Sequence, residues 1–391
     1  MPSVWREVKT LAIPKASHPN TLVDASLSSN ADYLAAAYGH EVGIWDLKKE
    51  LTSSDDPQSR FSNQYLRVQR MAWCWGTTQL AIGYDEGSVS VLSVHDGVVL
   101  MEGFGLATSP VDSVSGLAWL SPALLAVSMR STVEIWRFAS GNSILPIKLL
   151  LAIDVIPDEG QRLWSWCGRI PDPPIIPGQL QTPLILTMHA LANHEIMVQY
   201  ADVPVDYARI WNLAFDPFLA RLSILPWKLQ HKINDVSTGT GHALYTNHGS
   251  GTYGLLKIDS QQPPAQFYPQ ALESRAPQLV SCVKFVSKDL IIGGGVGQLI
   301  LWNHSLRRLQ NLVYKNSMVD SISSGYRLET DTGWIATAHR FQDRGQVVLW
   351  CTFDYEEAKV PTVAPGFLEL HKGTCIFVLS LFIVTILSFY L

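Results

Sequence analysis

The sequence has few charged residues and no long run of lysine and arginine. Of its 391 residues only 16% are charged, and the formal net charge is −5. Nucleic-acid binding relies on clustered basic side chains that neutralise phosphates, so we expect no nucleic-acid partner. Hydrophobic residues make up 47% of the chain, which is too apolar for a disordered protein and enough for a large core.

Cysteine is also scarce, and the five cysteines form no CxxC pair. They are Cys74, Cys167, Cys282, Cys351 and Cys375. A structural zinc site needs closely spaced Cys or His pairs, which the sequence lacks. The first four cysteines lie in apolar runs, which predicts buried, reduced thiols in a cytosolic protein. The first 15 residues contain no apolar stretch long enough for a signal peptide, which agrees with that location.

A short phrase recurs seven times: an apolar strand, a tight polar turn and a second apolar strand that often ends in Trp. The copies span 34–47, 80–94, 125–138, 184–200, 244–258, 290–304 and 334–352. A further strand precedes each copy, at 23–28, 70–75, 114–120, 162–168, 233–238, 280–286 and 319–324. Outer strands are predicted at 97–103, 147–153, 265–271 and 306–314. This pattern predicts an all-β, seven-bladed propeller of four-stranded antiparallel blades over residues 1–360.

Two features of the predicted ring stay open, its closure and its fourth blade. Either 4–13 or 358–364 supplies the last outer strand, and Pro361 disfavours the second. The key third-strand positions are Trp45, Leu92, Trp136, Val198, Leu256, Trp302 and Trp350. Most intervals are 44 to 48 residues, but both intervals beside Val198 are longer. The extra residues are the Pro-rich stretch 171–183 and the stretch 207–230, which fits a short helix or an added strand pair.

Four strand endings resemble the Trp-Asp ending of WD-repeat proteins: IWDL (44–47), IWRF (135–138), LWNH (301–304) and LWCT (349–352). The matching positions are Trp45, Asp46, Trp136, Trp302 and Trp350. Only Asp46 directly follows a Trp, the family's Gly-His pairs before the first strands are missing, and a turn Asp is retained at Asp85 and Asp343. The resemblance implies a platform for protein interactions, usually without catalysis. Apolar packing is then expected to replace most of the family's polar network.

The last 18 residues, 374–391, contain no charge, Gly or Pro. As a helix they would be roughly 27 Å long, close to the thickness of a bilayer's hydrocarbon core. We predict a transmembrane anchor after a linker at 361–373, with the propeller on the cytosolic face of an internal membrane, the endoplasmic reticulum being favoured. The anchoring side chains would be Ile376, Phe377, Leu379, Leu381, Phe382, Ile383, Ile386 and Leu387. Two alternatives stay open: a buried helix or strand, and translated intron sequence that would leave a cytoplasmic propeller.

The leading functional prediction is a non-catalytic scaffold that binds other proteins. Its candidate anchors are Trp211, Phe215, Phe218 and Trp227, unless these side chains pack onto the flank of the ring. A second hypothesis is a membrane-bound exchange factor for a small GTPase, because a propeller with a C-terminal span resembles such proteins. The region 35–43 lacks their glycine-rich cation-binding loop. A third is a ring-shaped hydrolase or oxidoreductase with its ligand at the central channel, whose mouth Asp24, Asp112, Asp235 and Asp320 would line unless these residues cap turns.

The remaining chemical motifs are weak. GGGVGQ (293–298) is followed by a strand and predicts a tight turn rather than a phosphate loop. His242, His248 and His304 are scattered on strand ends, and no GxSxG elbow occurs. The sequon 303–305 is expected to be unmodified. We therefore expect no catalytic residue, no metal, no cofactor and no small-molecule substrate.

Overall fold

The computed structural model describes most of the chain between residues 4 and 353. The described residues are 4–12, 23–49, 56–63, 65–94, 98–105, 112–138, 164–170, 183–191, 195–201, 207–213, 219–221, 233–239, 241–247, 252–257, 265–267, 280–287, 290–303, 305–306, 308–341 and 344–353. Residues 7–351 form the main compact unit, and residues 1–6 with 352–391 form another. The main unit carries the fold.

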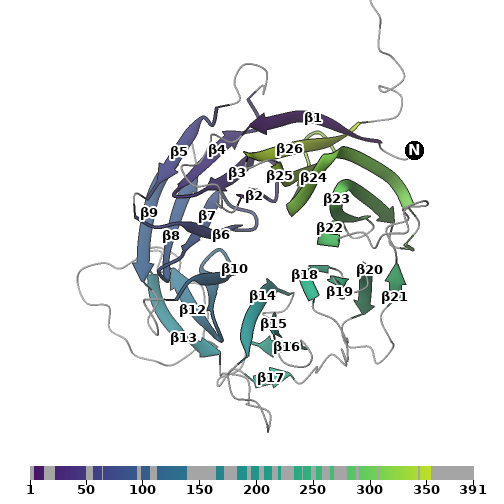
Figure 1. Cartoon of the computed structure of the whole chain (residues 1–391). Helices are drawn as coiled ribbons and strands as arrows, with labels where there is room; N and C mark the ends of the chain where they lie inside the picture. The colour runs from purple at the N-terminus through teal and green to yellow at the C-terminus, as the bar shows by residue number, and fades with distance from the viewer. Residues whose placement is uncertain are drawn as a thin grey trace, which may run out of the picture. The chain divides into compact units, whose positions relative to one another are not determined.

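The described residues form sheets whose strands follow one another in chain order, except that β1 joins the last sheet beside β26 (Figure 1). The first sheet contains β2 (Val23–Leu27), β3 (Tyr33–Tyr38), β4 (Glu41–Asp46) and β5 (Ser59–Ser62). The second contains β6 (Val68–Trp73), β7 (Gln79–Tyr84), β8 (Ser88–Val94) and β9 (Val98–Gly105). The third contains β10 (Val114–Ser121), β11 (Leu124–Met129), β12 (Thr132–Phe138) and β13 (Trp164–Ile170).

Three more sheets complete the main unit. The fourth contains β14 (Leu184–Ala190), β15 (Glu195–Ala201), β16 (Tyr207–Asn212) and β17 (Leu219–Arg221). The fifth contains β18 (Ile233–Gly239), β19 (His242–Asn247), β20 (Thr252–Lys257) and β21 (Ala265–Phe267). The sixth has six strands: β22 (Val280–Ser287), β23 (Leu290–Asn303), β24 (Arg308–Arg327), β25 (Thr332–Phe341), β26 (Arg344–Phe353) and β1 (Val4–Ala12).

The first strands of successive sheets contact one another in a closed cycle. β2 contacts β6, β6 contacts β10, and the series continues through β14 and β18 to β22; β24 then contacts both β22 and β2. Figure 1 shows these strands toward the middle of the unit, with the later strands of each sheet farther out. This arrangement is a β-propeller with four-stranded antiparallel blades. The predicted fold class is confirmed at that level.

The predicted number of seven separate blades is wrong for the described residues, which form six sheets. The strands expected for the sixth and seventh blades belong to one sheet because β24 runs unbroken from Arg308 to Arg327. Its first part pairs with β23, and its second part, from Met318 onward, pairs with β25. A single long strand therefore replaces the loop expected between two blades.

The fourth blade is also shifted relative to the prediction. Residues 164–170, expected as its first strand, form the outer strand β13 of the third sheet. The segment 184–190 is the first strand instead of the second, and Val198 lies on the second strand. The stretch 207–230, predicted to be an insertion, supplies β16 and β17 of the same sheet. Hydrophobic alternation marks these strands equally well in either position, so it did not reveal the shift.

The closing strand is as predicted. β1 lies at the edge of the sixth sheet next to β26, so the stretch 4–13 supplies its outer strand. The competing segment 358–364 lies outside the described residues. The predicted outer strand 147–153 also lies outside them.

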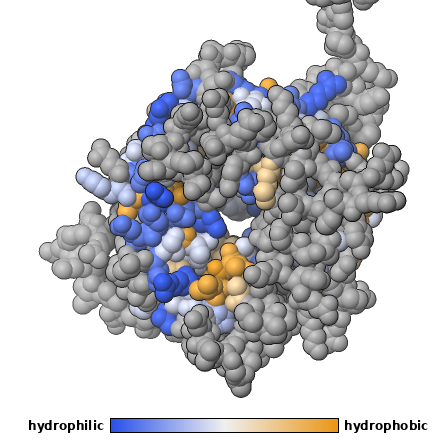
Figure 2. All heavy atoms as spheres, in the orientation of Figure 1, coloured by the Kyte–Doolittle hydropathy of each residue, from blue (hydrophilic) through white to orange (hydrophobic). Residues whose placement is uncertain are grey.

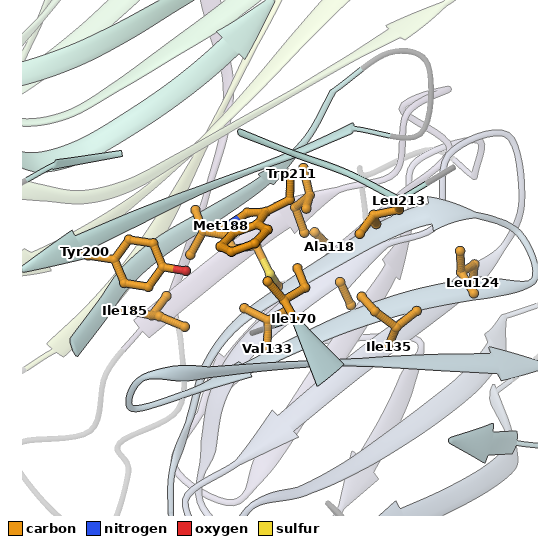
Figure 3. Packing of buried hydrophobic residues seen from close by; sticks show 13 residues of the cluster. Ala118, Leu124, Val133, Ile135, Ile170, Ile185, Met188, Tyr200, Trp211 and Leu213 are labelled. Carbon is orange, nitrogen blue, oxygen red and sulfur yellow. The ribbon is translucent and has the colours of Figure 1, made fainter. Parts of the chain in front are cut away.

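The core lies between neighbouring sheets rather than within a single one. One cluster joins the third and fourth sheets and includes Val133 and Ile135 from β12, Met188 from β14 and Trp211 from β16 (Figure 3). Similar clusters join the first sheet to the second and the second to the third. Each sheet presents apolar side chains on both faces and buries them only against its neighbours.

Polar bonds join the first strands to one another. The Trp73 indole on β6 donates a hydrogen bond to the carbonyl of Ser26 on β2 at 2.8 Å. On the next sheet, Trp119 donates in the same way to the carbonyl of Ala72 on β6 at 2.9 Å. At the junction of β24 and β2, the amide of Leu27 donates to the Ser323 hydroxyl at 2.8 Å. These bonds align neighbouring inner strands in addition to their apolar contacts.

Replacing Trp73 by Phe should lower the free energy of unfolding by about 1 kcal/mol, because it removes the indole donor while keeping an aromatic ring. Urea unfolding of the purified chain measures the change. Trp75→Phe, two residues further along, is the matched control because its side chain is exposed and should change stability little. Equal stability of the two variants would contradict the proposed role of the indole bond.

Candidate contact surface

Three large apolar side chains are exposed at the ends of β6 and β24, the two inner strands on either side of β2. Trp75 follows β6 and is 80% exposed, and Tyr326 and Leu328 lie at the end of β24 and are 42% and 85% exposed. Both strands contact β2, whose own following turn contains Ser29. We define the turn surface as Ser29, Trp75, Tyr326 and Leu328.

Trp75 is held in a tight turn that points it away from the sheet. The amide of Thr77 donates to the carbonyl of Cys74 at 3.3 Å, which closes a four-residue turn. Gly76 has a φ of 69°, the left-handed conformation that favours glycine at the third turn position. The Thr77 hydroxyl accepts a further bond from the amide of Gln79 at 3.1 Å. The turn thus fixes the backbone under an indole that contributes little to the core.

Ser29 joins the two halves of the turn surface. Its hydroxyl accepts a hydrogen bond from the amide of Gly76 at 3.2 Å, directly beside Trp75. Its carbonyl accepts one from the amide of Tyr326 at 3.0 Å. The turn after β6 and the end of β24 are therefore both hydrogen-bonded to Ser29, which follows β2 of the first sheet. The backbones that carry these exposed side chains are thus linked through Ser29.

The cations near the turn surface are engaged in ion pairs. Lys48 lies 2.8 Å from the Asp32 carboxylate, and the hydrogen bond to Asp32 raises the pKa of Lys48. Arg327 lies 3.8 Å from Asp32, donates to the carbonyl of Ala31 and stacks over Trp334 at 5.3 Å. Asp32 is thus the common acceptor for two basic side chains.

Two carboxylates beside Leu328 are exposed. Glu329 and Asp331 lie in the turn between β24 and β25, and Asp331 accepts a hydrogen bond from the Tyr326 hydroxyl. The surface therefore combines rigid aromatic and aliphatic groups with carboxylates. This chemistry suits burial against another macromolecule, because aromatic side chains dominate interface energetics.

One predicted partner-binding residue is corrected. Trp211 is only 3% exposed and packs in the cluster between the third and fourth sheets (Figure 3). Its role is structural, as the flank-packing alternative proposed. Phe215, Phe218 and Trp227 lie outside the described residues.

Sequence signals for both Trp211 and Trp75 were available. The segment RIWN (209–212) matches the IWRF and LWNH endings of other third strands, so it marks a third strand. Trp75 stands just before Gly76 at the end of an apolar run, where the strand must turn. That Trp75 is exposed follows only from the position of the turn.

The WD-type tryptophans are all buried, and Trp45 and Trp136 lie on the third strands of their four-stranded sheets. Trp45, Trp136, Trp302 and Trp350 lie on β4, β12, β23 and β26 and are all buried. Asp46 accepts a hydrogen bond from the amide of Lys48 and forms an ion pair with Lys49 at 3.4 Å. Asp85 accepts one from the amide of Arg67 at 3.0 Å, and Asp343 lies outside the described residues.

The predicted ring of aspartates does not form a metal cluster among the described residues. Asp112 lies 2.6 Å from Arg130 in an ion pair, so a neighbouring cation already neutralises it. Burial raises the pKa of Asp24, against the opposing effect of Arg70. No group of three metal-binding side chains occurs in the described part of the chain. The side chain of Asp235 lies outside that part.

The glycine-rich motif is part of a strand and not the tight turn that its composition predicted. Residues 293–298 lie within β23, which continues through them to Asn303. A Cβ on Gly293 would lie 2.6 Å from the Tyr253 ring, and the Tyr253 hydroxyl donates to the carbonyl of Gly294 at 2.8 Å. These glycines allow two sheets to pack closely.

The histidines, the cysteines and residues 35–43 lie in strands or turns where the structure describes them. His242 begins β19, whereas His248 and His304 lie outside the described residues. Cys74, Cys282 and Cys351 are buried free thiols, as predicted, but Cys167 is half-buried. Residues 35–43 form parts of β3 and β4 and the turn between them.

The predicted anchor, 374–391, lies outside the described residues. Within the portions that the structure does describe, we find no helix with the length and hydropathy needed to cross a bilayer.

In the orientation of Figure 1, Figure 2 shows hydrophilic side chains gathered over the first two sheets and a hydrophobic group beside a central hollow.

Comparison with known proteins identifies the fold but no family. No family model matches the chain, and no curated protein matches it in sequence. Among solved structures, the WD40 repeats of RRP9 share 13% identity and a TM-score of 0.60, covering 88% of this chain and 97% of that one. Raptor from Chaetomium thermophilum shares 12% identity and a TM-score of 0.63, covering 90% of this chain and 29% of that one. A chain of the mitotic checkpoint complex shares 11% identity and a TM-score of 0.59, covering 89% and 92%.

Replacing Trp211 by Ala should lower the free energy of unfolding by roughly 3–5 kcal/mol, because it leaves a cavity between two sheets. Leu184→Ala is the control, since Leu184 lies in the same sheet but is largely exposed. Chemical denaturation followed by circular dichroism measures both variants. A Trp211→Ala protein as stable as the wild type would restore the surface role predicted from sequence.

Stability should fall as the pH decreases from 6.5 to 4, partly because of His339. Burial lowers the pKa of His339 to about 4 from an ordinary value of 6.5, and Thr337 links its ring to Trp350. Between these values the unfolded chain binds a proton that the folded chain excludes, so acid favours unfolding, by on the order of 2–3 kcal/mol at pH 4. His339→Gln should flatten this part of the stability profile in urea titrations. An unchanged slope would show that other groups control the acid response.

Proposed function

We propose that this propeller is a non-catalytic scaffold that binds other proteins through the turn surface. The observation that carries the proposal is the rigid exposure of Trp75 and Leu328 beside a junction of three inner strands. The apolar surface of an exposed indole is removed from water only when a partner covers it, and that burial favours binding. Its backbone is already fixed, so binding costs little additional ordering.

The fold is compatible with this role. One of the similar structures is a mitotic checkpoint complex, so a propeller of this kind occurs within a protein assembly. The identity of 11% supports the comparison of fold and no transfer of partners. The choice of binding surface therefore rests on the exposed side chains of this chain.

We also propose that residues 374–391 hold the scaffold at an internal membrane, with the endoplasmic reticulum favoured. The support comes from the sequence: 18 consecutive residues without charge, Gly or Pro. His371 and Lys372 precede them, as expected for the cytosolic flank of a membrane span. The propeller would then present its turns to cytosolic proteins.

Proximity labelling in cells tests both parts of this proposal. The full chain should label a reproducible set of neighbours at a membrane, and a form truncated after Gly366 should lose the membrane set. Trp75→Ser combined with Leu328→Ser should lose the protein neighbours while keeping the membrane location, because only the contact surface is changed. Purified protein and circular dichroism verify folding.

Tyr65→Ser is the matched control for the surface variant. Tyr65 is 84% exposed but precedes β6, whereas Trp75 follows it, so the two side chains lie at opposite ends of that strand. Its replacement should leave the neighbour set unchanged. Neighbours that persist in the Trp75/Leu328 variant would contradict the assignment of the contact surface.

A further inference from the structure

We propose that the turn surface selects a basic, apolar peptide segment, one in which Lys or Arg stands beside aliphatic residues. This inference rests on the proposed scaffold function and adds the chemistry of its partner. The apolar requirement follows from Trp75 and Leu328, which expose most of their area. A segment that covers them must bring apolar atoms of its own.

The basic requirement follows from the charges around these side chains. Among the residues that the structure describes, four carboxylates lie on the adjoining turns, at Asp32, Asp46, Glu329 and Asp331. The described cations on those turns are three, at Lys48, Lys49 and Arg327, and each is in an ion pair with Asp32 or Asp46. The carboxylates of Glu329 and Asp331 are exposed beside Leu328. An approaching cation is therefore favoured over an anion.

The exposed indole supports the same choice. A guanidinium or ammonium group over an aromatic face is attracted by the ring, and Trp gives the strongest such contact. Arg327 already makes this contact with Trp334 at 5.3 Å. Trp75 is 80% exposed, so its indole can bind a partner cation in the same manner.

The same charges argue against a membrane as the occupant. Binding to an anionic lipid surface requires a cluster of Lys and Arg whose charges remain available. Among the described residues of the turns that adjoin Ser29 and Leu328, carboxylates outnumber cations, and the chain as a whole carries a net charge of −5. A protein segment of positive charge fits this surface better than a lipid headgroup layer.

Selection from a library of random phage-displayed peptides on the immobilised full chain in mild detergent tests the inference. The peptides enriched should contain Lys or Arg next to Leu, Ile, Val or Met. The best peptide, synthesised with a fluorophore, should bind Trp75→Ala about tenfold more weakly in fluorescence anisotropy. Glu329→Lys should weaken binding severalfold, and added salt should weaken binding to the wild type.

Tyr65→Ala is again the control and should bind the peptide as the wild type does. Enriched peptides that are acidic or lack charge would overturn the inference, even if their binding requires Trp75. Peptides that bind Trp75→Ala and the wild type equally would overturn it as well. Neither result decides the proposed scaffold function, because proximity labelling of the Trp75/Leu328 variant tests that function without any peptide.

Discussion

Contact between neighbouring first strands is the constraint on which the rest of this structure depends. Each sheet has apolar side chains on both faces, so none is stable without a sheet on either side. The first strands of successive sheets contact one another in a closed cycle. Hydrogen bonds from Trp73 and Trp119 to the preceding inner strand align the backbones there. Apolar packing farther out then follows from that alignment.

The WD-type tryptophans show how apolar packing and short polar networks together stabilise the sheets. Trp350 donates to Thr337, and Thr337 also contacts His339 at 2.7 Å within the last sheet. Trp136 donates instead to the buried carboxylate of Glu134 at 3.0 Å. Both indoles are buried in their sheets while their polar partners differ. Burial of the ring is the shared requirement, and each sheet satisfies the indole N–H with what its own sequence offers.

The turn surface is a consequence of the same junctions. Ser29 follows the inner strand β2 and bonds to groups that follow β6 and β24. Because these bonds fix the turns, Trp75 and Tyr326 are presented in defined positions at little additional entropic cost. On the proposed scaffold function, the specificity of binding would lie in the side chains of these few turns.

The sequence by itself determined the strand pattern, the buried tryptophans and the propeller class, because alternation of apolar residues and repeated Trp endings are local signals. It also predicted β1 as the closing strand, since Pro361 weakened the alternative. Only the tertiary structure decided that residues 164–170 belong to the third sheet, that β24 joins two predicted blades, and that Trp211 is buried while Trp75 is exposed. The physical reason is that strand pairing and exposure depend on neighbours distant in sequence, and equal hydrophobic patterns permit more than one pairing.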